Sequence, residues 1–279
     1  MLRIAVPNKG MLAETANEML QEAGYRGRGD SRELVAIDPI NDVEFFYLRP
    51  RDIATYVGSG VLDAGITGRD FLLNTESAAK EVRALDFGDS TFRFAGPAGE
   101  FTDVSQLQGK RVATSYTGLL GSWFARAGIE AELVPLEGAV ESAIRLGVAD
   151  AVADVVSTGG TLRKAGLEVF GPVILESTAV LISTPEKEHA ARRLLGRLDG
   201  VLVARRYAIM DYDIESSKLD AALAITPGFQ SPTISPLRDS EWVAVRSMVP
   251  QNELNQVMDQ LQDAGAKAII VTALQAVRV

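Results

Sequence analysis

The segment AVADVVSTGGTL (residues 151–162) carries the strongest structural signal in the sequence. Its apolar first half is typical of a buried strand, and a hydroxyl- and glycine-rich turn then leads into a helical pattern with Leu162 facing inward. Such a turn can bind an anion, because free backbone amides and the positive end of the helix dipole point out of it. An ordinary β-to-α turn would fit the same pattern, so the segment alone leaves both interpretations open.

The same alternation of strands and helices runs through residues 1–90. Apolar segments predict strands at 2–7, 43–48 and 62–67, and helical patterns follow each of them. Alternating elements of this kind indicate a mostly parallel sheet with helices packed on it.

A second α/β series begins near residue 91, after a more extended stretch. It predicts strands at 111–115, 131–135, 151–156 and 178–183, then a helix at 186–198 and an extended segment at 201–212. We therefore expect a two-lobed α/β body with a cleft between the lobes. Lobe I would comprise residues 1–90 with 184–211, and lobe II residues 91–183.

The C-terminal residues 212–279 form a separate predicted module. Its order of strand, helix, strand, strand, helix, strand is the βαββαβ, ferredoxin-like arrangement found in many small regulatory domains. Because a fold does not establish a function, a domain that only mediates oligomerisation remains an alternative.

Composition narrows the classes of function. The chain has 279 residues, a formal net charge of −9, no cysteine and one histidine, His189, which lies among charged residues. This composition excludes disulfides, thiolate metal sites and cysteine nucleophiles, and the charge argues against nucleic-acid binding while allowing a small anionic substrate. The N-terminal segment has no signal-peptide pattern and no apolar run could span a bilayer. We expect a soluble, cytoplasmic protein without nucleic-acid or membrane partners.

Charged side chains follow the three strands expected in the first lobe. Lys9 comes after the first strand, Arg49 after the second and Asp70 after the third. The carboxyl ends of parallel strands share one edge of a sheet, where open α/β sheets bind ligands. Singly, Lys9 and Arg49 fit solvated surface charges and Asp70 fits a helix cap. Together they predict a phosphate or pyrophosphate site.

The second lobe offers three further candidates. Tyr116 ends a strand and could stack on a base, Glu141 opens a helix and could hold ribose hydroxyls or a metal-bound phosphate, and Asp154 precedes the glycine turn. A packing role for Tyr116 and a helix-start role for Glu141 are the plainer alternatives. Neither G-x-x-x-x-G-K-[ST] nor G-x-G-x-x-G occurs, so any phosphate is bound in another way.

Taken together, these segments resemble the long-form ATP phosphoribosyltransferases, particularly those of actinobacteria, over essentially the full length. The resemblance rests on VPNKG (6–10), EFFYLRPRDIATYVGSG (44–60), LDAGITGRD (62–70), LEGAVE (136–141), LGVADAVADVVSTGGTL (146–162), AITPGFQSPTISPL (224–237) and WVAVRSMVP (242–250).

The resemblance implies a catalytic body with two lobes like those of periplasmic binding proteins and a C-terminal domain that binds histidine and inhibits the enzyme. It implies ATP and 5-phosphoribosyl 1-pyrophosphate as substrates, Mg²⁺ as cofactor and a homo-hexamer. The implied reaction joins N1 of ATP to C1 of the ribose and releases pyrophosphate, as the first step of histidine biosynthesis.

The resemblance also implies roles for individual residues, while the metal ligands stay unassigned. The residues implied to contact the substrates are Lys9, Arg49, Asp70, Tyr116, Glu141 and Asp154. The implied phosphate loop consists of Ser157, Thr158, Gly159, Gly160 and Thr161. The implied histidine contacts are Asp213, Phe229, Ser231, Thr233 and Ala268.

The chain departs from the family pattern in three places. Residues 116–123 read YTGLLGSW where close relatives have a Tyr-Pro-Asn-Leu run, Gly160 stands where Arg is common, and Phe229 stands where Leu is expected. The residues alone also leave two alternative functions: a two-lobed ligand-binding or sensor protein without catalysis, and a phosphoribosyltransferase that uses another base. The full-length resemblance and the C-terminal module favour ATP.

Overall fold

The computed structural model describes residues 1–30, 32–75, 77–156, 159–239 and 241–278, and of Thr161 it describes only the backbone. The chain divides into two compact units, Met1–Gln21 with Tyr25–Leu195, and Glu22–Gly24 with Gly196–Val279. In the part of the chain that is described, no helix combines the length and apolar character needed to cross a bilayer.

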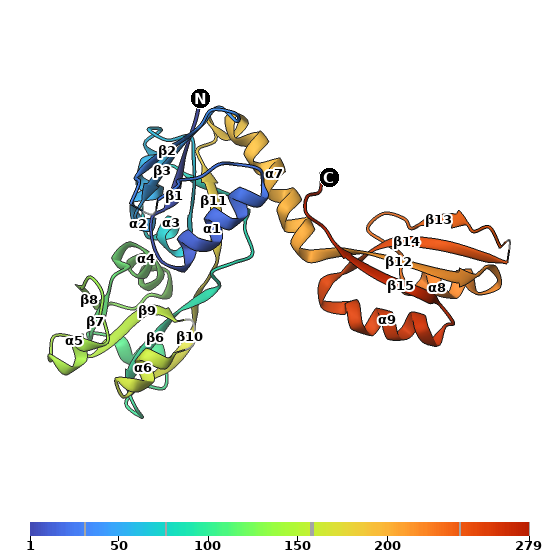
Figure 1. The fold of residues 1–279 in the computed structure, drawn as a ribbon. Coiled ribbons are helices and arrows are strands. Elements are labelled where there is room, and N and C mark those ends of the chain that lie inside the picture. Colours follow the sequence, from blue (N-terminus) through green and yellow to red (C-terminus); the bar gives the residue numbers. More distant parts are fainter. Residues whose placement is uncertain (31, 76, 157–158, 240, 279) are drawn as a thin grey trace. The chain divides into compact units, whose positions relative to one another are not determined.

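The first unit begins with a sheet in the order β2-β3-β1-β4-β11-β5 (Figure 1). The central strands β3, β1 and β4 are parallel, whereas β2, β11 and β5 each pair antiparallel with their neighbours. The helices that accompany this sheet are α1 (Met11–Glu22), α2 (Pro50–Gly58) and α3 (Arg69–Asn74). The strands are β1 (Leu2–Pro7), β2 (Val35–Asp38), β3 (Val43–Leu48), β4 (Ala64–Gly68), β5 (Lys80–Ala84) and β11 (Ala179–Ser183).

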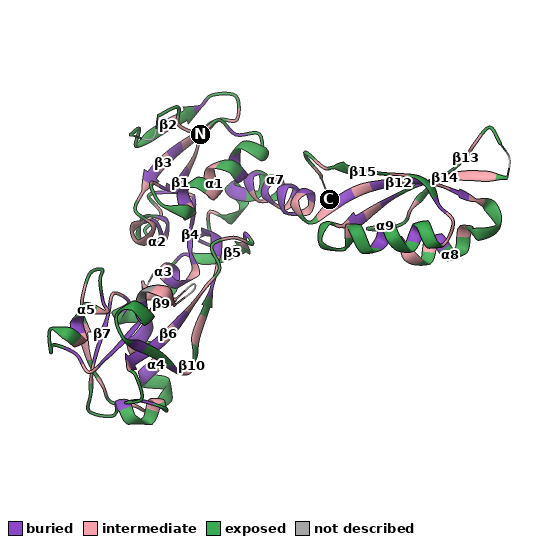
Figure 2. Ribbon diagram, turned by 60° about the horizontal axis from the view of Figure 1, so that its bottom comes forward, coloured by how far each residue is buried: buried purple, intermediate pink, exposed green. Residues whose placement is uncertain are grey.

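The second lobe of this unit contains a sheet in the order β10-β6-β9-β7-β8, whose inner strands are buried in Figure 2. Aromatic rings fill one face of it, with Phe94 stacked on Phe170 and tilted against Phe124. The strands are β6 (Ser90–Pro97), β7 (Arg111–Thr114), β8 (Glu132–Pro135), β9 (Ala151–Val156) and β10 (Leu167–Ser177). The helices are the 3₁₀ turn η1 (Val104–Leu107), α4 (Thr117–Ala127), α5 (Ser142–Arg145) and α6 (Gly160–Lys164).

The strands β6 and β10 connect the lobes. The chain enters the second lobe at Ser90 and leaves it at Ser177, and these residues are partners in the antiparallel β6–β10 pair. The strand β11 follows at once and returns the chain to the first sheet. The lobes are therefore joined where two strands lie side by side, as the two-lobed prediction requires.

Three boundaries differ from the prediction. Residues 201–206, expected to be extended, continue the helix α7 (Glu188–Arg206), because Leu194, Leu198 and Val201 are buried at helical spacing. The strand β11, expected in lobe II, pairs with β4 and β5 in the first sheet. The C-terminal sheet begins at Tyr207 rather than near residue 212.

The C-terminal unit confirms the predicted βαββαβ order. Its sheet has the strand order β13-β14-β12-β15 with antiparallel neighbours throughout, and α8 and α9 pack against one face. Alternate residues of β12 are buried under these helices, which leaves the other face of the sheet open. The elements are β12 (Tyr207–Glu215), η2 (Ser216–Lys218), α8 (Leu219–Ile225), β13 (Thr233–Pro236), β14 (Trp242–Pro250), η3 (Gln251–Glu253), α9 (Leu254–Asp263) and β15 (Lys267–Ala273).

Gly65 allows α2 to pack closely on β4. A Cβ atom at this position would lie 2.5 Å from Ile53 Cγ2 and 3.1 Å from Val57 Cγ2. We predict that Gly65→Ala lowers the free energy of unfolding by about 1–3 kcal/mol, the usual effect of overpacking. Gly196→Ala, in open space on α7, should instead stabilise the chain by up to ~1 kcal/mol. Urea unfolding followed by circular dichroism measures both changes, and equal stability of the two variants would contradict the packing argument.

Candidate active site between the lobes

The predicted strand ends meet at one edge of the first sheet. Because β3, β1 and β4 are adjacent and parallel, their carboxyl ends place Arg49, Lys9 and Asp70 along the same edge. Lys9 and Arg49 are exposed, whereas Asp70 is only 5% exposed. The edge thus presents two accessible cations beside one buried carboxylate.

Asp70 is held by groups from elsewhere in the unit. The hydroxyl of Ser177 donates a hydrogen bond to Asp70 Oδ1 at 2.8 Å and accepts one from the Asp70 amide at 3.0 Å. The phenol of Tyr116, from the second lobe, lies close enough to Asp70 for the carboxylate to influence it. Burial first, and then the negative charge of Asp70, raise the pKa of Tyr116, so the phenol remains neutral. This proximity links the two lobes.

The ring of Tyr116 is buried rather than displayed. Its centroid lies 5.4 Å from that of Phe71 and 5.2 Å from that of Phe92, and the residue is 7% exposed. The hydroxyl, rather than a ring face, is therefore the part of Tyr116 that lies next to the candidate site.

Carboxylates of the second lobe lie near Asp70. Burial raises the pKa of Asp154, and the charges of Glu141 and Asp70 raise it further, while the Val155 amide opposes the shift by donating to Asp154 Oδ1 at 2.8 Å. These negative groups come from both lobes and repel one another. Such an arrangement suits a ligand that brings hydroxyl donors or positive charge.

The glycine turn follows Asp154 directly. Gly159 has φ 68°, a left-handed conformation that glycine adopts without steric cost, and Gly160 begins α6. The Gly159 carbonyl accepts the Arg163 amide at 3.1 Å. Ser157 and Thr158 lie outside the described residues, as does the side chain of Thr161.

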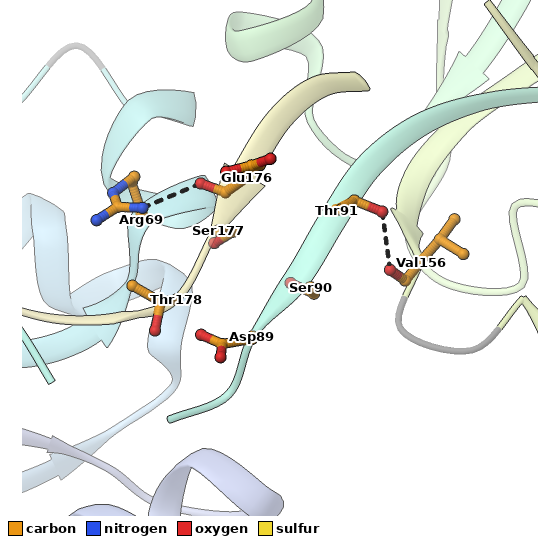
Figure 3. Close-up of a pocket in the computed structure, with 8 residues that line it drawn as sticks. All are labelled: Arg69, Asp89, Ser90, Thr91, Val156, Glu176, Ser177 and Thr178. Carbon is orange, nitrogen blue, oxygen red and sulfur yellow. Dashed lines mark hydrogen bonds between the residues drawn. The ribbon is translucent and has the colours of Figure 1, made fainter. Parts of the chain in front are cut away.

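A pocket of about 470 Å³ lies where the connecting strands pass between the lobes (Figure 3). Ser177 forms part of its wall, and Thr91 Oγ1 donates to the Val156 carbonyl at 3.2 Å, which ties β6 to the end of β9 just before the glycine turn. The pocket thus adjoins both Asp70 and the turn. Its lining consists of Arg69, Asp89, Ser90, Thr91, Val156, Glu176, Ser177 and Thr178.

Arg69 fixes the start of α3 next to this pocket. Its guanidinium donates twice to Glu81, each time at 2.8 Å, and once to the Glu176 carbonyl at 3.0 Å. The hydrogen bond from Arg69 is the main cause of a lowered pKa of Glu81. The ion pair therefore anchors the residue before Asp70 to strand β5 and to β10.

Sequence reasoning missed three residues of this region. Arg51 Nη1 lies 2.6 Å from Glu137 Oε1 across the lobes, Ser177 holds Asp70, and Asn74 accepts the Leu119 amide. Arg51 stands in the same LRPRD run as Arg49 and could have been found by that signal. The other two contacts join residues far apart in sequence, and no local pattern marks them.

The residues implied for histidine fall into two groups on the C-terminal sheet. Phe229, Ser231 and Thr233 line a pocket of about 370 Å³. Asp213 lies on β12, and Ala268, which has φ 51°, lies on the edge strand β15 at a register irregularity opposite Asp213. The structure brings the first three together, and it places the other two at another part of the sheet.

Comparison with known proteins gives consistent results along the whole chain. The family model HisG: ATP phosphoribosyltransferase matches residues 49–200, and the model HisG, C-terminal domain matches residues 204–276. ATP phosphoribosyltransferases of Arthrobacter sp. (strain FB24) and Streptomyces coelicolor are 60% and 55% identical, and each alignment covers 100% of both chains.

A solved structure agrees with the first unit. The ATP phosphoribosyl transferase (HisG:HisZ) complex from Thermotoga maritima contains a chain that matches 72% of this chain with 98% of its own length, at 28% identity and a TM-score of 0.64. With the family model and the full-length relatives, this likeness confirms both the resemblance seen in the sequence and the two-lobed α/β fold. The chain therefore belongs to the ATP phosphoribosyltransferase family, in the long form that carries a C-terminal domain.

Proposed function

We propose that the site between the lobes transfers the phosphoribosyl group of 5-phosphoribosyl 1-pyrophosphate to N1 of ATP and releases pyrophosphate, the first step of histidine biosynthesis. One observation carries the proposal beyond family membership: the charge of Asp70, in one lobe, raises the pKa of Asp154, which lies in the other lobe just before a glycine turn. A site built from both lobes can bind two substrates at once.

The turn after Asp154 is our candidate for the ribose 5-phosphate. Gly159 has a left-handed conformation just before α6, the first amides of α6 would donate to the phosphate, and the side chains of Ser157, Thr158 and Thr161 would add hydroxyl donors. The carboxylates of Asp154 and Glu141 would accept hydrogen bonds from the ribose hydroxyls. Their negative charge would also stabilise the positive charge that develops at C1 as pyrophosphate departs.

The first lobe would hold ATP and the leaving group. Lys9 and Arg49 would contact phosphate oxygens, and Asp70, oriented by Ser177, would face the adenine. Adenine N1 offers a lone pair at neutral pH, so the attack needs no strong base. The protein's main task is alignment, which can contribute roughly 7–11 kcal/mol to rate acceleration.

Magnesium fits this site as part of the substrate complex. Among the described residues, no group of three or more Asp, Glu or His side chains is arranged to hold a metal. Mg²⁺ usually keeps several waters and binds through substrate phosphates with few protein ligands. We therefore propose that the ion enters with the pyrophosphate and neutralises its charge.

The C-terminal domain is our candidate for histidine-dependent inhibition. Thr233 and Ala268 lie on opposite edge strands of the sheet, three strand spacings or about 14 Å apart, which exceeds the reach of one histidine. We infer that a neighbouring copy brings the two groups together, in agreement with a homo-hexamer. Because the relatives are biosynthetic enzymes, we also propose that the protein works in the cytoplasm.

Lys9→Ala should lower kcat/KM about 100-fold, since it removes a cation from the phosphate contacts. Pyrophosphate release from both substrates with magnesium measures the effect, and Lys80→Ala, at another exposed lysine on β5, should behave like the parent. A folded Lys9→Ala protein with parental kinetics would remove Lys9 from the site. No release by the parent itself would contradict the proposed activity and favour a two-lobed binding protein.

Asp154→Asn should lower kcat about 100-fold or more and yet raise the Tm of the ligand-free protein. When folding raises the pKa of a carboxyl, the folded protein becomes less stable as the pH rises from the ordinary pKa of that carboxyl, 3.8, through its folded pKa. The gain from Asn should therefore be complete at neutral pH and disappear near pH 4.

Asp150→Asn is the matched control. Hydrogen bonds from Arg111 lower the pKa of Asp150, so its charge stabilises the fold at neutral pH, and this contribution is lost as pH falls through the folded pKa. Asp150→Asn should therefore lower Tm at pH 7 and leave kcat unchanged. Differential scanning fluorimetry across pH distinguishes the variants, and a drop in Tm for Asp154→Asn would refute the assignment of Asp154 as a repelled carboxylate.

Thr233→Ala should raise the histidine concentration needed for half inhibition about tenfold, a size typical of allosteric coupling, and should spare uninhibited turnover. Ser235→Ala, on the same strand but outside the pocket lining, serves as the control. Titrations of pyrophosphate release with histidine provide the measurement. Identical inhibition of the parent and Thr233→Ala would exclude Thr233 from the sensor.

A further inference from the structure

The two lobes touch through the helices α3 and α4. Asp70 and Asn74 are four residues apart on α3 and therefore share a face. That face meets the start of α4, where the buried Tyr116 lies near Asp70 and the Leu119 amide donates to Asn74 Oδ1 at 3.1 Å. One helical face of the first lobe is thus matched to one helical turn of the second.

Asn74 supplies a cap that α4 does not supply for itself. The first amides of a helix lack partners within the helix and need an outside acceptor. Within the described structure, the residue at the N-cap position, Tyr116, makes no capping hydrogen bond with its side chain. The acceptor comes from Asn74 at the end of α3, across the lobe boundary. The Leu119 amide is therefore satisfied when the lobes stand at this separation.

Gly118 determines how closely the helices approach. A Cβ atom at this position would overlap the main-chain carbonyl oxygen of Asn74, which cannot rotate away like a flexible side chain. The other glycine of α4, Gly121, would place its Cβ in an ordinary 3.5 Å contact with Leu133 Cδ1. Gly118 is thus needed for space at the lobe contact, and it lies in the run 116–123 that departs from the pattern of close relatives.

We propose that Asn74 and Gly118 are positioning residues: their contact sets the separation of the lobes, and with it the distance between Asp70 and the carboxylates Asp154 and Glu141. The inference rests on the proposed function, because a reaction governed by alignment is sensitive to this distance. A misplacement of about 1 Å can cost about 100-fold in rate. Neither residue needs to touch a substrate to have this effect.

Gly118→Ala tests the contact directly. We expect kcat to fall about 10- to 100-fold. Binding of ribose 5-phosphate, measured by calorimetry, should stay within about twofold of the parent, because the phosphate turn and both ribose carboxylates lie on the second lobe. Gly121→Ala adds the same methyl group to the same helix and should keep parental kcat. Parental kcat for Gly118→Ala would overturn the proposal.

Asn74 variants separate positioning from general stability. Asn74→Ala removes the acceptor for the Leu119 amide and should lower kcat. Asn74→Asp keeps an acceptor oxygen, and Asp caps helices as well as Asn does, so this variant should keep most of the parental kcat. Equal losses in both variants would show that the cap is not the relevant feature.

A distance measurement tests the lobe separation itself. The chain contains no cysteine, so cysteines introduced at the exposed residues Thr55 and Lys110 can carry spin labels specifically, one on each lobe. Double electron–electron resonance between the two labels should show a longer or broader distance distribution for Gly118→Ala than for the parent and Gly121→Ala. An unchanged distribution would refute the inference. This readout does not depend on turnover, so a parent without activity would contradict the proposed function alone.

Discussion

A buried carboxylate at the end of β4 constrains the whole N-terminal unit. Burying a negative charge is strongly unfavourable unless hydrogen bonds replace its water. Asp70 is hydrogen-bonded by Ser177, on the strand that returns from the second lobe, and it lies near the buried phenol of Tyr116, inside that lobe. Since neither residue is near Asp70 in sequence, both lobes and the connecting strand must be in place before this residue is stable. The same requirement places Asp70 opposite Asp154.

The carboxylate of Asp154 shows the opposite balance. Burial and neighbouring carboxylates disfavour its ionised form. Among the contacts described for it, the Val155 amide is the one that favours the ionised form. Asp150, a few residues earlier, forms a close ion pair with Arg111 and stabilises the fold. Ionised Asp150 therefore stabilises the fold, because the cation Arg111 lies beside it. Ionised Asp154 destabilises the fold, because it faces the site and other carboxylates instead. Unfavourable charge that a ligand relieves is a common feature of binding sites.

Much of the fold and the site could be predicted from local patterns. The positions of Lys9, Arg49 and Asp70 follow from strands that end in charged residues, and the C-terminal order follows from periodicity. The membership of β11 could not be predicted, because a short apolar strand of five residues, AVLIS, does not specify which sheet it joins. The end of α7 was missed because Val201 continues a helical stripe that also fits a strand. Ser177 and Asn74 act through partners 107 and 45 residues away, which no local pattern encodes.

The start of α4 shows why a motif comparison and a structure inform different parts of the argument. Motifs identify groups that touch substrates, and by that criterion the unusual run 116–123 affects only Tyr116. In the structure the same run also provides Gly118 and the Leu119 amide, which contact Asn74 in the other lobe. A change in this run can therefore alter the alignment of two substrates while every group that binds them stays the same. Alignment of polyanionic substrates is the main contribution such a site makes to catalysis, so the spacing of the lobes is under the same chemical constraint as the residues that line them.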